Sequence, residues 1–515
     1  MLLQKQLRAS FIYLSEVKHI SSMQFTKDLY QHSLALLTDL YQLTMAYGYY
    51  KNHKAEQRGL FHLYFRKNPF QGGFTIASGL ENVIDFINNF KYTNDDLKYL
   101  SSLRDKKDNP MFPDDFLRYI SGLKFDCQVD AVEEGAIVFP QEPLIRVEGP
   151  MIQCQLLETP LLNLVNFQTL ITTKAARMWL AAEGDPILEF GLRRAQGVDG
   201  GVSASRAAYI GGCSSTSNVL AGKLYDIPVS GTHAHSWIMS YDNELESFQA
   251  YGKSYPDNSI FLVDTYDSIK GVRNAIEAAK KLREQGSEMV GIRLDSGDLA
   301  YLSKQTRKML DENGFHNAKI VASNDLDEHL IKSLKIQGAK IDLWGIGTKL
   351  ATGYDQPALG GVYKLSAIQD ENGKWEQKIK LSEQVAKINN PGKLQVKRFF
   401  NNNELQADMI FNEWNHENHK FTIIDPMDPT RRKKLNLNQF EARDLLVPIY
   451  REGQQVYQNP DINTIKTKVQ EGLAQLHDGI KRFVNPHVYP VGLEEKLYNL
   501  KMELVMNLRE SVKNS

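Results

Sequence analysis

Two histidines two residues apart, His233 and His235, are the side chains of this sequence best suited to chemistry near neutral pH. They lie in the stretch Ser230-Gly-Thr-His-Ala-His-Ser-Trp237, directly after an apolar run at residues 227–229 that is typical of the end of a buried strand. An imidazole there can exchange a proton or accept a phosphoryl group. The stretch alone distinguishes neither an active site from a solvated turn nor one histidine from the other.

The elements that must position these histidines lie in residues 166–366, where short apolar runs alternate with helical runs. The candidate strands are residues 186–190, 227–229, 259–263, 289–294, 319–322, 340–344 and 361–365. Convincing helices lie between several of them, for example at residues 269–285 and 298–312. Alternation of this kind indicates a parallel sheet, and so many strands at this spacing favour a (β/α) barrel over an open sheet.

Polar residues follow these strands at their carboxyl ends, where parallel folds place active sites. The first strand leads to Arg193, the second to Thr232 and His235, and the fourth carries Arg293 and leads to Asp295. The fourth strand also leads to Asp298, and other strand ends carry Asp264, Ser323-Asn-Asp325 and Gly345-Ile-Gly-Thr348. A helix cap explains any one of these residues, but six polar strand ends in succession favour an active site.

The mix of groups at these strand ends favours anionic ligands. Arg193 and Arg293 can bind carboxylates or phosphates through two hydrogen bonds at once. The turn Gly345-Ile-Gly-Thr348 offers exposed backbone N–H groups to phosphate oxygens. Aspartates such as Asp295 can position Mg²⁺, a ribose diol or an arginine. We therefore expect a site for a phosphorylated sugar and an anionic or aromatic partner, with a histidine between them.

The remaining segments suggest how the chain is divided. We expect a non-essential extension at residues 1–22, an α+β domain at 23–165, the barrel at 166–366 and a C-terminal segment at 367–515. The helical pattern of residues 34–50 places Tyr41 among apolar neighbours, so core packing is its default role. The basic run Arg431-Arg-Lys-Lys434 is interpreted as a solvated face.

Composition argues against several classes of protein. With 42% hydrophobic and 24% charged residues and a formal net charge of -1, the chain resembles a soluble globular protein without the basic surface that non-specific nucleic-acid binding needs. It has no apolar run of about eighteen residues, so we expect no membrane span. Cys127, Cys154 and Cys213 are widely spaced, which indicates a reducing cytoplasm rather than a metal site or disulfide framework.

Six motifs, in order, resemble those of nicotinate phosphoribosyltransferases. They are Leu37-Thr-Asp-Leu-Tyr-Gln42, Phe65-Arg-Lys-Asn-Pro-Phe70, Glu189-Phe-Gly-Leu-Arg-Arg-Ala-Gln196, Gly231-Thr-His-Ala-His-Ser236, Leu294-Asp-Ser-Gly-Asp298 and Gly345-Ile-Gly-Thr348. The resemblance implies the irregular α/β barrel of type II phosphoribosyltransferases, flanked by an α+β domain built from the N- and C-terminal segments. It also implies a homodimer with active sites near the subunit interface.

The resemblance further implies the reaction. Nicotinate and 5-phosphoribosyl-1-diphosphate would give nicotinate mononucleotide and diphosphate, coupled to hydrolysis of ATP through a phosphohistidine. This is the first step of NAD synthesis from nicotinate. Mg²⁺ is the implied cofactor, and the sequence does not assign its ligands.

The motifs also imply residue roles. His235 falls at the phosphorylated position, whereas His233 falls at a variable position and is interpreted as incidental. Tyr41, Thr232 and Arg293 match nicotinate contacts, and the resemblance leaves open whether Tyr41 acts in the site of its own subunit or in that of its partner. Contacts to phosphoribosyl diphosphate or other substrate groups are expected from Thr348 and, by position in the motifs, from Arg193, Asp295, Gly345 and Gly347.

Three alternatives stay open at this point. One is a related phosphoribosyltransferase that acts on nicotinamide, which lacks the carboxylate, or on quinolinate, which has two. Another is a non-catalytic barrel protein, which the polar strand ends disfavour. The third is a metal-dependent aldolase or lyase, which would need a Schiff-base lysine or a dense Glu/His cluster. Lys349 has no local reason for a lowered pKa.

Overall fold

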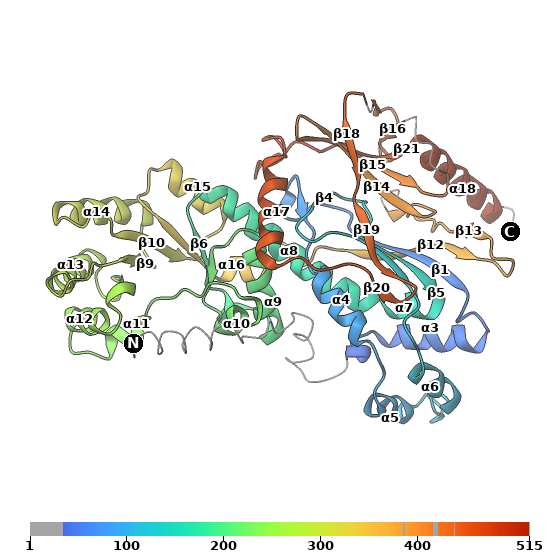
Figure 1. Cartoon of the computed structure of the whole chain (residues 1–515), viewed down its shortest axis with the longest axis horizontal. Helices are drawn as coiled ribbons and strands as arrows, with labels where there is room; N and C mark the ends of the chain where they lie inside the picture. The colour runs from blue at the N-terminus through green and yellow to red at the C-terminus, as the bar shows by residue number, and fades with distance from the viewer. Residues whose placement is uncertain (1–33, 385–386, 416–420, 437, 514–515) are drawn as a thin grey trace, which may run out of the picture.

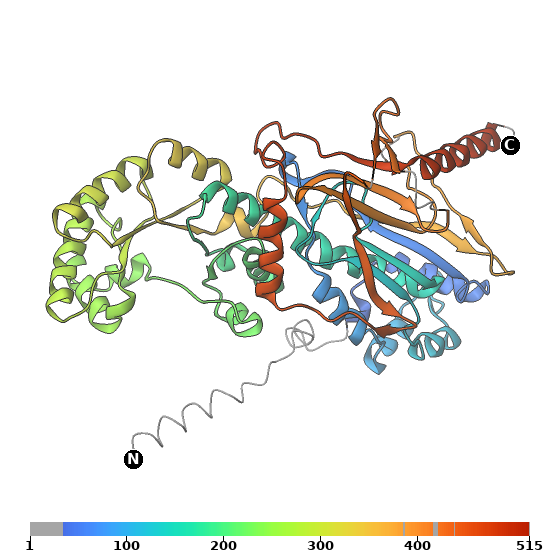
Figure 2. The ribbon, with the colours of Figure 1, turned by 45° about the horizontal axis from the view of Figure 1, so that its top comes forward.

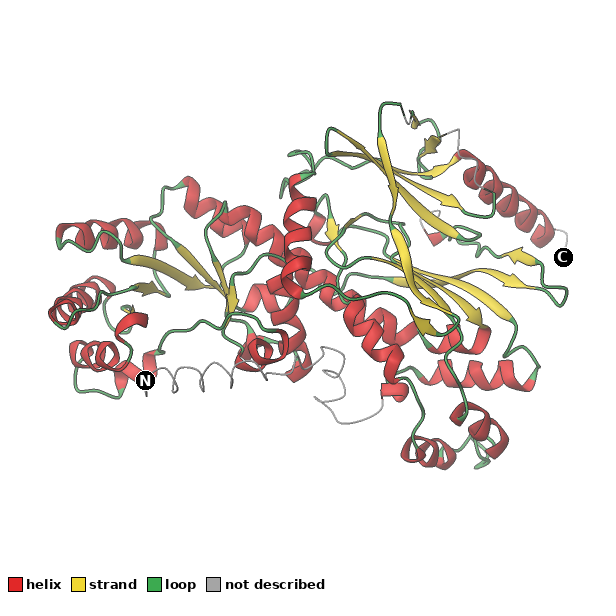
Figure 3. Cartoon of the chain, in the orientation of Figure 1, coloured by secondary structure: helices red, strands yellow, loops and turns green. Residues whose placement is uncertain are grey.

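A computed structural model describes residues 34–384, 387–415, 421–436 and 438–513. A parallel sheet with its helices lies at one end of the molecule and antiparallel and mixed sheets lie at the other (Figures 1 and 3). The long helix α8 (Glu158–Ala182) runs between the two ends. The predicted extension at residues 1–22 lies outside the described residues. No helix in the described ranges is long and apolar enough to cross a membrane.

The parallel sheet has six strands in the order β7-β6-β11-β10-β9-β8. They are β6 (Ile187–Glu189), β7 (Ser215–Thr216), β8 (Ile260–Leu262), β9 (Gly291–Leu294), β10 (Lys319–Asn324) and β11 (Leu343–Ile346). The predicted strand at residues 227–229 is present only as a single parallel bridge between Val229 and Thr216. Within the described residues β7 and β8 form no ladder with each other, so this sheet stays open.

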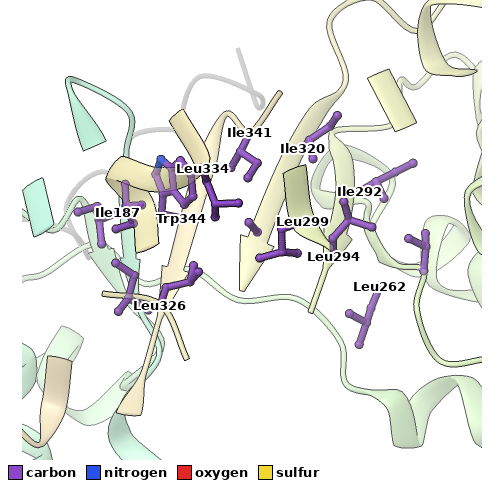
Figure 4. Close-up of a cluster of buried hydrophobic side chains, with 14 of the residues drawn as sticks. Ile187, Leu262, Ile292, Leu294, Leu299, Ile320, Leu326, Leu334, Ile341 and Trp344 are labelled. Carbon is purple, nitrogen blue, oxygen red and sulfur yellow. The ribbon is translucent and has the colours of Figure 1, made fainter. Parts of the chain in front are cut away.

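Helices pack against the parallel sheet and share its hydrophobic core. They include α9 (Gly197–Ile210), α10 (Val219–Tyr225), α11 (His235–Met239), α12 (Glu244–Ser254), α13 (Ser268–Glu284), α14 (Leu299–Glu312), α15 (Glu328–Ile336) and α16 (Thr348–Ala351). Strands covered in this way carry continuous apolar runs. Ile187, Ile292, Ile320 and Trp344 meet in one buried cluster (Figure 4). The mixed α/β fold expected from the alternation is confirmed.

The prediction that residues 361–365 form a seventh strand of the parallel sheet is wrong. This segment belongs to β12 (Val362–Gln369), which pairs antiparallel with β1 (Arg58–Tyr64) in a different sheet. Tyr363 stacks on Phe61 with ring centroids 4.9 Å apart. The error has a physical reason: an apolar run shows that a strand is buried, but not which sheet it joins.

That other sheet has seven strands and mixes distant parts of the chain. Its order is β13 (Trp375–Gln377), β12, β1, β5 (Ile145–Pro150), β3 (Gln128–Val132), β19 (Leu446–Arg451) and β20 (Gln454–Gln455). All its pairs are antiparallel, and Val129 shares a core with Ile449. N- and C-terminal segments therefore fold together here. The boundaries proposed at residues 23–165, 166–366 and 367–515 stay predictions.

A third, mixed sheet and further helices complete the chain. Its strands are β17 (Arg432–Leu435), β16 (Phe421–Ile424), β21 (Val491–Glu494), β15 (Glu404–Asn412), β14 (Leu394–Asn401) and β18 (Glu441–Asp444). A short pair joins β2 (Thr75–Ile76) to β4 (Ile137–Val138). The helices are α3 (Leu40–Lys51), α4 (Leu80–Asn89), α5 (Asn94–Ser102), α6 (Asp114–Ser121), α7 (Met151–Leu156), α17 (Ile462–Ala474) and α18 (Glu495–Lys513). Figure 2 shows α17 crossing the middle of the molecule, where it packs against α9.

A buried ion-pair cluster links α8 to α15. Glu328 lies 2.8 Å from both Lys174 Nζ and Arg177 Nε, and all three side chains are buried. Burial pushes the pKa of Glu328 up, but the two cations outweigh it and hold the pKa below its ordinary value. The ionised carboxylate therefore stabilises the fold above about pH 4.3, and the stabilisation is lost as pH falls through the lowered pKa.

Glu328→Gln is expected to lower the free energy of unfolding by about 3–5 kcal/mol, because it leaves two buried cations unpaired. Glu277→Gln is the matched control, since Glu277 pairs with Lys280 on the exposed face of α13 and should cost less than about 1 kcal/mol. Urea unfolding at neutral pH measures both. Equal effects of the two substitutions would show that the buried cluster does not stabilise the fold.

Candidate active site

His235 lies at the start of α11 with its two ring nitrogens in different environments. Nδ1 is 3.1 Å from Thr265 Oγ1, just beyond the carboxyl end of β8. Nε2 is 4.0 Å from Asp295 Oδ2, beyond the end of β9, and 43% of the side chain is exposed. Because the threonine engages Nδ1, Nε2 is the nitrogen available for chemistry.

Arg293, on β9, is fixed by three neighbours. Its Nε donates to Ser323 Oγ at 2.7 Å, Nη1 to Thr232 Oγ1 at 3.0 Å and Nη2 to Asp295 Oδ1 at 2.7 Å. Since a guanidinium carries five N–H donors, these bonds leave two N–H groups for a ligand. The guanidinium also lies 5.7 Å from the centre of the Phe190 ring. The arrangement suits a planar carboxylate that accepts two parallel hydrogen bonds.

Asp295 joins Arg293 to His235. Its Oδ1 accepts from Arg293 and from Ser323, on β10. Burial raises the pKa of Asp295, but Ser323 and Arg293 outweigh burial and hold the pKa below its ordinary value. Asp295 is therefore ionised at neutral pH and can balance a cation beside His235. Its backbone N–H donates to Asp264 Oδ2 at 2.9 Å.

The predicted phosphate turn overlaps the end of β11, because Gly345 and Ile346 belong to the strand and only Gly347 and Thr348 follow it. A Cβ on Gly345 would lie 2.8 Å from the Phe190 ring, and one on Gly347 would lie 3.0 Å from Phe190 O. Both glycines therefore let β11 approach residue 190, whose ring faces Arg293. Thr348 begins α16 directly after Gly347. The predicted contacts of Gly345, Gly347 and Thr348 with substrate stay predictions.

The chain brings together some of the other predicted residues and not all. Arg193 lies on a short 3-10 helix, η4 (Leu192–Arg194), after β6 and is exposed, so its charge is free to meet a ligand. Tyr41 is 49% exposed on α3, at the opposite end of the molecule from β9 and β10 (Figure 1). Its expected place in the apolar core is wrong, and it does not approach His235 of its own chain.

Two polar strand-end residues are structural. Asp298 caps α14, since its Oδ1 accepts from Tyr301 N at 3.0 Å. Glu189 is buried and accepts from the hydroxyls of Ser205, at 2.9 Å, and Thr216, at 2.5 Å. Sequence reasoning missed the roles of Thr265 and Phe190. Thr265 was detectable only as the neighbour of Asp264, and Phe190 carried no signal because apolar residues at strand ends usually join the core.

Comparisons with known proteins identify the family of the chain. The model for the nicotinate phosphoribosyltransferase (NAPRTase) family matches residues 186–407, and the models for its N- and C-terminal domains match residues 36–166 and 393–501. A nicotinate phosphoribosyltransferase of Bacillus subtilis is 45% identical over 93% of this chain and 97% of its own length. The human one is 32% identical over 90% of this chain and 95% of its own.

Solved structures agree as well. The crystal structure of human nicotinic acid phosphoribosyltransferase superposes with a TM-score of 0.79 at 30% identity, covering 91% of this chain and 99% of that one. The Pyrococcus furiosus nicotinate-nucleotide pyrophosphorylase, at 21% identity and a TM-score of 0.66, shares the fold. The fold is thus that of a phosphoribosyl-transferring enzyme. The chain belongs to the nicotinate phosphoribosyltransferase family and serves NAD biosynthesis.

Gly345→Ala is expected to reduce kcat/KM for nicotinate at least tenfold, because the new methyl group displaces Phe190 and with it Arg293, at a cost in stability of about 1–3 kcal/mol. Gly200→Ala, on α9, is the control, since no atom lies within 4 Å of its Cβ position. It should leave activity unchanged. Steady-state kinetics and urea unfolding test both variants, and wild-type kinetics for Gly345→Ala would contradict the packing argument.

Proposed function

We propose that this nicotinate phosphoribosyltransferase couples its reaction to ATP through phosphorylation of His235 on Nε2. Nε2 attacks the γ-phosphorus, the bond from that phosphorus to the bridging oxygen breaks, and ADP leaves. Later hydrolysis of the phosphohistidine releases phosphate. The observation that carries the proposal is the orientation of the His235 imidazole: Thr265 contacts Nδ1 and Asp295 faces Nε2. A carboxylate facing Nε2 stabilises the cationic imidazole that forms as the phosphoryl group arrives.

Nicotinate is proposed to bind through Arg293 and Thr232. The two guanidinium N–H groups not used by the protein would meet the nicotinate carboxylate, and Asp295, Ser323 and Thr232 keep the guanidinium in place. Nicotinamide has no carboxylate, so it would leave these two N–H groups of Arg293 without an anionic acceptor. This contact would favour nicotinate over its neutral analogue.

Phosphoribosyl diphosphate is proposed to lie along the strand ends after β6 and β11. Arg193 would face its negative charge, and the backbone at Gly345 and Gly347, with the Thr348 hydroxyl, would bind phosphate oxygens. As the bond from C1 of ribose to diphosphate breaks, positive charge develops on the sugar and negative charge on the leaving group. The residues therefore act mainly by positioning and electrostatic stabilisation.

Mg²⁺ is proposed to be bound mainly by substrate phosphates, whose charge it would offset. Asp264 Oδ1 is buried and has no hydrogen-bond partner among the described residues, as expected of an oxygen that faces a cation or its water. No group of three or more His, Cys, Asp or Glu in the described ranges could hold a metal alone. This donor set fits an ion that arrives with its substrate.

A homodimer is proposed to complete the site. Tyr41 is exposed on α3 and far from His235 of its own chain, as expected of a residue that stacks on nicotinate in a partner's site. A cytoplasmic location is also proposed. Cys127 Sγ and Cys154 Sγ lie 4.0 Å apart without a disulfide, which suits a reducing compartment.

Incubation with γ-labelled ATP is expected to place acid-labile, base-stable label on His235, and His235→Asn should abolish it together with the ATP-dependent gain in turnover. His316→Asn is the matched control, because His316 is an exposed histidine in the turn between α14 and β10. Peptide mapping after alkaline hydrolysis locates the label. Label on another residue, or none in the wild type, would overturn the proposal.

Arg293→Lys is expected to raise the KM for nicotinate at least tenfold, since one ammonium cannot make the bidentate contact, while preference over nicotinamide falls by a similar factor. Arg273→Lys, on α13, is the control and should leave both values unchanged. Competitive turnover of the two substrates measures the preference. Unchanged discrimination in Arg293→Lys would remove Arg293 from nicotinate recognition.

A further inference from the structure

A cavity of about 410 Å³ lies at the antiparallel end of the molecule, away from His235. Its walls come from the third sheet, from α18 and from the chain around residues 139 and 388–390. Much of the lining is apolar, including Phe139, Ile410, Tyr489 and Leu493. A cavity of this size and character fits a small organic molecule.

Two cations that form no ion pair among the described residues line this cavity, Arg66 and Lys501. Lys501, on α18, is only 7% exposed, and its Nζ donates to Ile388 O at 3.2 Å and to Asn390 Oδ1 at 2.9 Å. Among the described residues no carboxylate lies within 4.0 Å of it. Asp425 lines the same cavity, but its Oδ1 accepts from Met427 N and its Oδ2 faces a different cation, Arg431.

The third N–H donor of the Lys501 ammonium has no acceptor among the hydrogen bonds described above. An ammonium has three donors, and two neutral oxygens satisfy only two of them. Burial lowers the pKa of Lys501 to about 8, so the group is mostly charged at neutral pH. A buried charge is costly unless it is paired. A ligand that carries one negative charge would remove this cost.

We propose that the Lys501 cavity binds a small organic anion: an apolar or aromatic body that carries one carboxylate or sulfonate. The acidic group would accept the third Lys501 proton, and the body would pack between Phe139, Ile410 and Leu493. Within one chain the site is separate from the strand ends that hold His235 and Arg293.

Two probes that differ only in the charged group test this assignment. 8-Anilinonaphthalene-1-sulfonate and N-phenyl-1-naphthylamine share an apolar body, and only the first carries a sulfonate. Fluorescence titrations are made on the full-length enzyme with saturating ATP and nicotinate, which occupy the active site. Lys501→Met should weaken sulfonate binding at least tenfold and leave the neutral probe unaffected. Lys308→Met, at an exposed lysine, should change neither.

Met427→Glu provides a second route, because Met427 is exposed and lines the same cavity. Its new negative charge should lower the affinity for the sulfonate probe at least tenfold. This result can be obtained even if Lys501→Met folds poorly. Turnover of nicotinate should stay unchanged in both variants, since neither residue touches the active site. Equal sulfonate affinity in wild type and Met427→Glu, or no sulfonate binding by the wild type, would overturn the proposal.

A different observation concerns His233, which sequence reasoning had set aside as incidental. Its Nε2 accepts a hydrogen bond from Leu262 N at 3.3 Å, on the edge strand β8. The ring is 7% exposed and contacts the Tyr251 ring edge-on at a centroid distance of 4.7 Å. The imidazole thus satisfies a backbone donor at the open edge of the parallel sheet.

The position of this contact within the loop matters. Thr232, one residue before it, is bonded to Arg293, and His235, two residues after it, is bonded to Thr265. Leu262 is the last residue of β8, and Thr265 follows it by three residues. One hydrogen bond therefore fixes the segment that carries both a nicotinate-binding hydroxyl and the proposed phosphoryl acceptor.

The geometry points to His233 as a positioning residue that ties the 230–235 loop to β8 and so sets the place of His235. The inference rests on the proposed phosphorylation of His235. Accepting from a backbone N–H requires an unprotonated Nε2. Burial lowers the pKa of His233 to about 4, so the ring is neutral at physiological pH.

His233→Gln keeps an acceptor at a similar reach, whereas His233→Leu removes it. The rate of His235 phosphorylation by labelled ATP should fall at least tenfold in His233→Leu and recover in part in His233→Gln. Amide exchange at Leu262, slow in the wild type, should accelerate in His233→Leu only. A wild-type phosphorylation rate in His233→Leu, or unprotected Leu262 in the wild type, would overturn the inference. Absence of phosphorylation in the wild type would instead count against the proposed function.

Discussion

The ion pair between Arg293 and Asp295 is the interaction on which the rest of the site depends. It joins two groups two residues apart at the end of β9 and recruits Ser323 from β10 and Thr232 from the loop after the Thr216 bridge. Asp295 then faces His235. The Arg293 guanidinium and the carboxylate that faces His235 are thus fixed by one network. Because each of several short strands contributes one member of the network, no single strand has to hold it.

The network is held from behind by packing. Phe190 lies against Arg293 and fits only because residues 345 and 347 are glycines. The buried cluster of Glu328 with Lys174 and Arg177 links α15, which lies between β10 and β11 in the chain, to the long helix α8. Cores close-packed in this way transmit small displacements. Packing against Phe190 therefore requires glycine at residues 345 and 347, whatever ligand the turn binds.

Sequence reasoning predicted the elements whose physical signal is local. Alternating apolar and helical runs identified the parallel sheet, and the polar strand ends identified Arg293, Asp295 and His235 as neighbours. It assigned residues 361–365 to the wrong sheet because strand pairing is a long-range property. Thr265 and Phe190 were missed because a threonine and a phenylalanine carry no distinctive spacing. Lys501 was out of reach, since nothing in an amphipathic helix marks which lysine lacks a counterion.

The central claim is that the site presents Nε2 of His235, and not Nδ1, to the γ-phosphate of ATP. The most direct measurement is nitrogen–phosphorus coupling by NMR on enzyme labelled with ¹⁵N-histidine and phosphorylated by ATP. The account predicts that the phosphorus couples to Nε2 of His235, because Thr265 engages Nδ1. Coupling to Nδ1, or to another histidine, would contradict it.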